Sequence, residues 1–224
     1  MIRHPDEIQI LPDDYCRRLD LARLFRSAAP LHVDVGCGDG GFLLELARRR
    51  GRDNFLGIER LFGRVRKICR QAVRDQLANL RVLRLECGYT VRYLLPPASV
   101  ASMFVLFPDP WPKARHRPRR LLDAAFLSAA RDSLRPDGEL IIKTDHDDYA
   151  RAIGHELAAV AGLRRLAWND ICVANIETDF ERQFVAEGRP IHCFRACRAD
   201  SAGRDCRGDR AGASQPPDAA SHAG

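Results

Sequence analysis

The chain has 224 residues, of which 46% are hydrophobic and 29% charged, a composition typical of one folded domain and unlike that of a wholly disordered protein. No stretch approaches the roughly 18 uninterrupted apolar residues that a membrane-spanning helix needs, and the first 30 residues carry too much charge for a secretory signal, so we expect a cytoplasmic protein. The net charge of +6 modestly favours polyanionic partners, and the absence of any CxxC pair among the eight cysteines predicts no metal site.

Short apolar runs alternate with helical patterns along most of the chain. Residues 1–30 precede this alternation and are interpreted as an N-terminal extension that can be flexible. Residues 199–224 contain no aromatic residue and no aliphatic residue larger than alanine, so they are predicted to form a disordered tail. The domain between them, 31–198, has predicted strands at 31–35, 54–59, 80–85, 100–107, 139–144, 163–168 and 191–197, and predicted helices at 41–50, 61–78, 119–134 and 146–160. This order predicts a doubly wound α/β fold with a mostly parallel seven-stranded sheet.

The first predicted strand leads into a glycine-rich turn. The sequence GCGDGG, which starts at Gly36 and includes Gly38, fits GxGxxG between a strand and a helix. Asp34 and Asp39 would repel the pyrophosphate of a dinucleotide and favour a cationic ligand, such as S-adenosylmethionine with its sulfonium and ammonium groups. Glu59 follows the second strand about 20 residues on, where a ribose-binding carboxylate is expected. The alternative is that Glu59 points to solvent at the end of its strand.

The helix predicted at 61–78 has two opposite faces. One is apolar, and the other carries the basic side chains of Arg64, Lys67, Arg70 and Arg74. These cations form either the solvated outer surface of a helix packed on the sheet or a phosphate-binding face.

A proline-rich loop follows the fourth predicted strand. In FPDPWPK, residues 107–113, three alternating prolines exclude a helix and predict a stiff extended loop at the end of the sheet where α/β proteins bind ligands. Asp109 is interpreted as a site carboxylate or, alternatively, as a turn residue. The run KARHRPRR at 113–120 contains no acid, which predicts contact with a nucleic-acid backbone.

Two further places offer polar side chains to this edge of the sheet. Asp145 follows the fifth predicted strand, where it either caps the next helix or forms a second active-site carboxylate. The stretch 178–182, TDFER, follows a segment without clear periodicity, and we interpret it as a loop folded over the site.

In this order and spacing, DVGCGDGG, NFLGIE, LFPDPWPKARHRPRR, LIIKTDHDDYA and TDFERQF resemble the bacterial tRNA (guanine-N7)-methyltransferase family, from about Leu31 to Ala196. The resemblance implies a class I methyltransferase fold, S-adenosyl-L-methionine as cofactor and tRNA as partner. It also implies methyl transfer to N7 of a guanine in the variable loop. The chain could act as a monomer or as a homodimer.

The glycine turn and the resemblance together assign roles to particular residues. Predicted cofactor contacts are Asp34, Gly36, Gly38, Glu59, Glu86 and Asp109, and predicted substrate contacts are Lys113, Arg115, Arg117, Asp145, Thr178 and Glu181. Asp109 is also the predicted catalytic residue. Asp34 stands where the family more often has Glu, and Glu86 where it usually has Asp. Because guanine N7 has an in-plane lone pair and no proton, its methylation requires no general base.

Two other functions are compatible with part of these features. An S-adenosylmethionine-dependent enzyme with another substrate would share the glycine turn and Glu59 but would not need the basic run. A non-catalytic RNA-binding module would need the basic run but not Asp34 and Glu59 together. Since the chain has both sets of residues, a tRNA methyltransferase is the favoured hypothesis.

Overall fold

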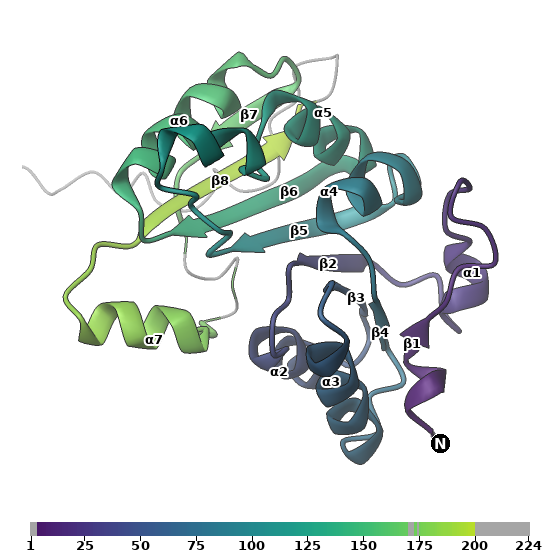
Figure 1. Cartoon of the computed structure of the whole chain (residues 1–224). Coiled ribbons are helices and arrows are strands. Elements are labelled where there is room, and N and C mark those ends of the chain that lie inside the picture. The colour runs from purple at the N-terminus through teal and green to yellow at the C-terminus, as the bar shows by residue number, and fades with distance from the viewer. Residues whose placement is uncertain (1–3, 170–172, 174, 200–224) are drawn as a thin grey trace, which may run out of the picture.

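A sheet of eight strands forms the middle layer of the computed structural model, which describes residues 4–169, 173 and 175–199 (Figure 1). In chain order the strands are β1 (Gln9–Ile10), β2 (Leu31–Val35), β3 (Asn54–Ile58), β4 (Leu80–Leu83), β5 (Val100–Leu106), β6 (Leu134–Thr144), β7 (Leu163–Leu166) and β8 (His192–Arg198). Their order across the sheet is β1-β4-β3-β2-β5-β6-β8-β7. All neighbours are parallel except that β8 runs antiparallel to β6 and β7.

Helices cover both faces of this sheet. They are α1 (Leu21–Leu24), α2 (Gly41–Arg49), α3 (Phe62–Arg74), α4 (Cys87–Tyr89), α5 (Ala124–Ser133), α6 (Asp147–Ala159) and α7 (Asp179–Ala186), with shorter turns η1 (Pro5–Glu7), η2 (Thr90–Leu94) and η3 (Ala114–Arg119). Leu43 of α2 and Ile68 of α3 belong to the core cluster on one face, whereas Phe126 of α5 and Tyr149 of α6 belong to the cluster on the other. Every residue of β2 and β3 is buried, as strands covered on both faces require. The predicted doubly wound α/β fold is confirmed.

The segment before Leu31 contributes to this core. Gln9–Ile10 pairs with β4 at the sheet edge, which makes eight strands where we expected seven. Ile8, Leu19 and Phe25 are all less than a tenth exposed. The segment 4–30 therefore adds a two-residue strand and several buried apolar side chains to the domain, although most of its residues are exposed. A strand of two residues is too short to be recognised from the sequence. The predicted tail lies outside the described residues from position 200 on.

Two element boundaries differ from the prediction. The helix predicted from 119 begins at Ala124, because the Asp123 carboxylate accepts a hydrogen bond from the Phe126 amide and caps α5 there. Strand β6 begins at Leu134, and Asp137, with a φ of 60°, lies in a stretch where its register with β5 shifts. The strand predicted from 139 therefore begins at Leu134 and contains an irregularity around Asp137. Every helix in the described residues is too short or too polar to cross a lipid bilayer.

Candidate active site

The carboxyl ends of β2, β3, β4 and β5 surround a cavity of about 570 Å³. All six predicted cofactor residues line it, namely Asp34, Gly36, Gly38, Glu59, Glu86 and Asp109. Residues far apart in the chain meet here because parallel strands end at the same edge of a sheet. The structure therefore gathers these residues around one cavity, while their roles stay predictions.

The glycine turn is fixed to the neighbouring strand. The amides of Gly36 and Cys37 donate to the Ile58 carbonyl at 2.8 and 3.0 Å, and the Gly38 amide donates to the Glu59 carboxylate at 3.1 Å. Glu59 also accepts from the Leu61 amide at 2.7 Å and is only 6% exposed. The alternative that Glu59 points to solvent is therefore wrong. Its carboxylate holds the turn and still has acceptor capacity toward the cavity.

Asp34 is 4% exposed at the end of β2, between the turn and Glu59. Burial, followed by the charge of Glu59, raises the pKa of Asp34 from 3.8 to about 7. The neighbouring thiols of Cys37 and Cys87 add no charge, since burial raises the pKa of Cys87 to about 12 and that of Cys37 well above its usual range. The ionised form of Asp34 is thus costly, and a bound cation or hydrogen-bond donor would offset that cost.

Asp39 is neutralised by the helix beneath it. Its carboxylate pairs with Lys67 at 2.6 Å and with Arg64 at 3.4 Å, both on α3. The repulsion of a pyrophosphate that we expected from Asp39 is therefore largely compensated. Asp34 is close to its pKa at neutral pH, and the buried Glu59 carboxylate also lies 3.8 Å from the Arg64 guanidinium, so the charge argument against such a ligand is weaker than the sequence predicted.

Glu86 begins α4 at the cavity wall. Its two carboxylate oxygens accept from the amides of Gly88 at 2.8 Å and Tyr89 at 2.5 Å, the geometry of a helix N-cap. The side chain is exposed and retains acceptor capacity toward the cavity. Glu86 is positioned to contact a ligand while it stabilises the start of the helix.

The proline-rich loop forms the rim of the cavity beyond β5. Phe107 and Trp111 have φ angles of 54° and 42°, an unusual backbone conformation for non-glycine residues. Asp109, between them, is exposed and lines the cavity. Arg119 also lines the cavity, with its guanidinium 5.1 Å from the centroid of the Trp111 ring. In the sequence, Arg119 is marked only by its place in the basic run, and its position at the cavity became visible in the fold.

The basic run is less free of acid than its sequence indicates. Residues 114–119 form η3, and Asp148 of α6 pairs with Arg117 at 3.2 Å and with Arg120 at 2.6 Å. The Arg120 side chain is only 9% exposed and also donates to the Pro110 carbonyl at 2.8 Å. Lys113 and Arg115 remain exposed, outside the residues that line the cavity. Although the run itself contains no acid, Arg117 and Arg120 are thus paired with a carboxylate from α6.

The stretch 178–182 begins a helix and is not the loop that we expected. Thr178 caps α7 by accepting from the Glu181 amide at 3.0 Å, and Thr178, Asp179 and Phe180 line the cavity. The Glu181 carboxylate points instead to the buried Lys143 ammonium, at 2.5 Å. The two residues are 38 positions apart, so no local pattern in the sequence predicts this contact.

Asp145 does not cap the following helix. His146 is the N-cap of α6, accepting at Nδ1 from the Tyr149 amide, and the Asp145 carboxylate pairs with Arg189 beyond α7. Asp145 and Glu181 therefore lie outside the residues that line the cavity, and both carboxylates are already paired with cations. In the part of the chain that the structure describes, no three His, Cys, Asp or Glu side chains cluster in a way that could hold a metal ion.

Comparison with solved structures identifies the fold. The 16S rRNA methyltransferase KamB superposes with a TM-score of 0.59 at 18% identity, covering 82% of this chain and 95% of KamB. The 16S rRNA (adenine(1408)-N(1))-methyltransferase from Catenulisporales acidiphilia, crystallised with its cosubstrate SAM, gives 0.56 at 18% identity, with coverage of 90% and 94%. The chain thus has the class I methyltransferase fold.

Sequence comparison identifies the family. A family model described as "Putative methyltransferase" matches residues 28–194. A tRNA (guanine-N(7)-)-methyltransferase of Syntrophotalea carbinolica is 33% identical over 77% of this chain and 76% of its own length, and one of Lactobacillus gasseri is 32% identical over 88% and 93%. The chain belongs to the tRNA (guanine-N7)-methyltransferase family, which confirms the resemblance in its motifs.

Proposed function

We propose that this chain methylates N7 of a guanine in the variable loop of tRNA, in the cytoplasm, with S-adenosylmethionine as the methyl donor. The observation that carries the proposal is the cavity at the carboxyl edge of the sheet, which is lined by Asp34 and Glu59 after β2 and β3, by Asp109 of the proline-rich loop and by Arg119 of η3. Carboxylates that suit a cationic cofactor thus share one cavity with a guanidinium that suits RNA.

The residues around the glycine turn fit such a cofactor. A Cβ added at Gly38 would meet nothing nearer than 4.0 Å, so this backbone faces open space. Glu59 and Glu86 each have acceptor capacity left for hydroxyl or amino groups, and the buried Asp34 is stabilised by any donor or cation placed beside it. Bound S-adenosylmethionine supplies a methyl group on a positively charged sulfur. We assign its binding to Asp34, Gly36, Gly38, Glu59 and Glu86.

The protein's part in the reaction is to hold and orient the guanine. Since N7 carries no proton, alignment of the base is the main requirement, and no side chain has to act as a base. Asp109, exposed on a stiff loop at the cavity rim, can accept hydrogen bonds from guanine N1–H and N2–H. Its negative charge would also stabilise the positive charge that methylation places on the ring. Arg119, at the same rim, is suited to an adjacent phosphate.

Some predicted substrate contacts need a change of partner before they can act. Asp145 and Glu181 are held by Arg189 and Lys143, so either carboxylate can bind a guanine only by sharing or exchanging its cation. Thr178 lies at the cavity, while Lys113 and Arg115 extend from the protein beyond its rim. We assign Arg115 to the tRNA backbone, where its positive charge is useful without an enclosed site. Lys113 stands on the same proline-rich loop as Asp109, and we assign it to a phosphate or carbonyl oxygen of the substrate near the guanine.

Nucleoside mass spectrometry tests this proposal directly. Incubation of unmodified tRNA transcripts with the protein and S-adenosylmethionine should produce 7-methylguanosine, mapped by nuclease fragments to the variable loop. Calorimetry should show binding of S-adenosylmethionine or its demethylated product and none of NAD. A different methylated nucleoside, an unmodified transcript, or binding of NAD alone would overturn the proposal.

A further inference from the structure

An exposed aromatic side chain begins α3, next to the cavity. Phe62 is 47% exposed, and two guanidinium groups lie over its ring, that of Arg66 at 5.5 Å and that of Arg84 at 4.9 Å from the centroid. Arg66 stands one helical turn further along α3, and Arg84 directly follows β4. Arg70, another turn along the helix, extends the same row of cations. We call Phe62, Arg66, Arg70 and Arg84 the α3 patch.

The charges of the α3 patch are not compensated by acids. Helix α3 has five basic residues and no acidic one, and Asp39 engages two of the five, Arg64 and Lys67. Within the described residues no carboxylate pairs with Arg66, Arg70 or Arg84, and all three side chains are exposed. Like charges one helical turn apart destabilise a helix by a few tenths of a kcal/mol per pair, so this arrangement does not serve the stability of α3.

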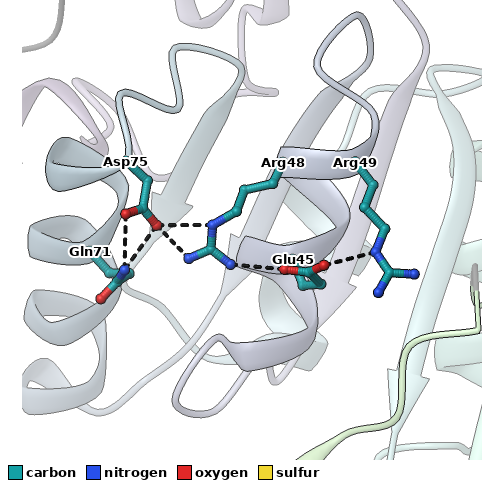
Figure 2. A network of polar contacts seen from close by, with 5 residues as sticks. All are labelled: Glu45, Arg48, Arg49, Gln71 and Asp75. Atoms are coloured by element: carbon teal, nitrogen blue, oxygen red, sulfur yellow. Dashed lines mark hydrogen bonds and ion pairs between the residues drawn. The ribbon is translucent and has the colours of Figure 1, made fainter.

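On the neighbouring helix α2, the surface arginines are paired with carboxylates. There Arg48 bridges Glu45 and Asp75, and Arg49 pairs with Glu45 (Figure 2). Gln71 of α3 joins this network through the Asp75 carboxylate. Arg66 and Arg84 of the α3 patch contact an aromatic ring, whereas Arg48 and Arg49 of α2 contact carboxylates. The arginines of α2 thus belong to an ion-paired surface, whereas the cations of the α3 patch are available to a ligand.

The position of the α3 patch connects it with the cavity. Arg60 and Leu61, which immediately precede Phe62, line the cavity together with Glu59. The proline-rich loop and η3 lie at the other side of the same cavity, after β5. A polyanion that enters from the η3 side and crosses the mouth would therefore reach the α3 patch, and a tRNA is large enough to contact both sides.

From this geometry we infer that the α3 patch is a second RNA-binding surface, on which Phe62 stacks an unpaired tRNA base while Arg66, Arg70 and Arg84 bind the adjoining phosphates. This inference rests on the proposed function and adds a separate contact to it. A half-exposed aromatic ring offers a face to any base, and guanidinium groups beside it bind the flanking backbone. The ligand chemistry is thus single-stranded RNA next to the methylated guanine.

Stacking and phosphate contacts leave different signatures in binding experiments. We would measure the affinity for a fluorescent tRNA transcript between 50 and 300 mM salt. For Phe62→Ala the affinity should fall about 10-fold while the salt slope is unchanged, because a stacked base releases no counterions. In the double variant that carries Arg66→Ala and Arg84→Ala, the slope of log affinity against log salt concentration should become less steep by about two units. Phe62→Trp should retain the affinity, since its ring also stacks.

A matched control and the catalytic constants complete the test. Arg49→Ala removes the same charge from a paired site on α2 and should leave both affinity and slope almost unchanged. Phe62→Ala should raise KM for tRNA about 10-fold with kcat unchanged, and its melting temperature should match that of the unmodified protein.

The outcomes separate this inference from the proposed function. If the unmodified protein forms no 7-methylguanosine, the proposed function itself fails. If it methylates tRNA while Phe62→Ala and the double arginine variant bind tRNA with normal affinity and slope, only the α3 patch is refuted. Equal losses in the Arg49→Ala control would likewise refute it, because net charge would then explain the effect.

Discussion

Replacement of Lys143 by Met should release α7 from the rest of the protein. The Lys143 ammonium and Glu181 carboxylate are 2.5 Å apart, and their side chains are 5% and 13% exposed. Breaking such a buried pair by removing one partner costs about 3–5 kcal/mol, because the other charge is left uncompensated. Helix α7 has no fully buried residue, so the remaining charge can reach water if the helix detaches. The penalty should therefore appear as local opening of α7.

The size of the effect follows from that penalty. Since 1.4 kcal/mol is a factor of ten, amide hydrogen exchange in 179–186 should accelerate by roughly a hundred- to a few thousand-fold, up to complete loss of protection. Exchange in β6 should change little, because its hydrogen bonds to β5 and β8 remain. Exchange followed by mass spectrometry resolves these two segments.

Two variants decide whether the ion pair is responsible. Arg182→Ala breaks the exposed pair with Asp179 on the same helix and should change exchange by no more than about fivefold. Lys143→Met combined with Glu181→Leu removes both charges and should restore much of the protection. Exchange of α7 at the normal rate in Lys143→Met would refute the argument, as would an equal acceleration in β6.

Four further predictions concern the cavity, its rim and the basic run beside it. An acid whose pKa rises from 3.8 in the unfolded chain to about 7 in the fold destabilises the fold as pH increases. In urea unfolding, the free energy of unfolding of Asp34→Asn should therefore rise relative to that of the unmodified protein by about 4 kcal/mol as the pH goes from 4 to 8. A difference between the two proteins that is independent of pH would contradict this. Asp109→Asn should lower kcat about 100-fold with an unchanged melting temperature, and a matched loss of stability would instead indicate a turn residue. Arg120→Ala should lower the melting temperature, whereas Arg115→Ala should only reduce the salt slope of tRNA binding by about one unit. Lys113→Arg should lower turnover more than Arg115→Ala does and leave that slope unchanged; normal turnover would show that only its charge matters.

The sequence by itself determined the order of the elements and the edge of the sheet that carries the cavity. Continuous apolar runs predicted the central strands, since strands buried on both faces need no polar alternation. Glycine and proline restrict the backbone locally, so the turn at Gly36 and the loop around Asp109 could be located without tertiary information.

Tertiary structure decided which charges are compensated. Asp39 meets Lys67 across 28 positions, Arg120 meets Asp148 across another 28, and Lys143 meets Glu181 across 38. Whether a carboxylate repels a ligand or a basic run binds RNA depends on these partners, and packing of the helices on the sheet brings them together. Charge pairing acts through space, whereas the signals of strands, turns and prolines are carried by neighbouring residues, so the sequence located the site and only the fold revealed its electrostatics.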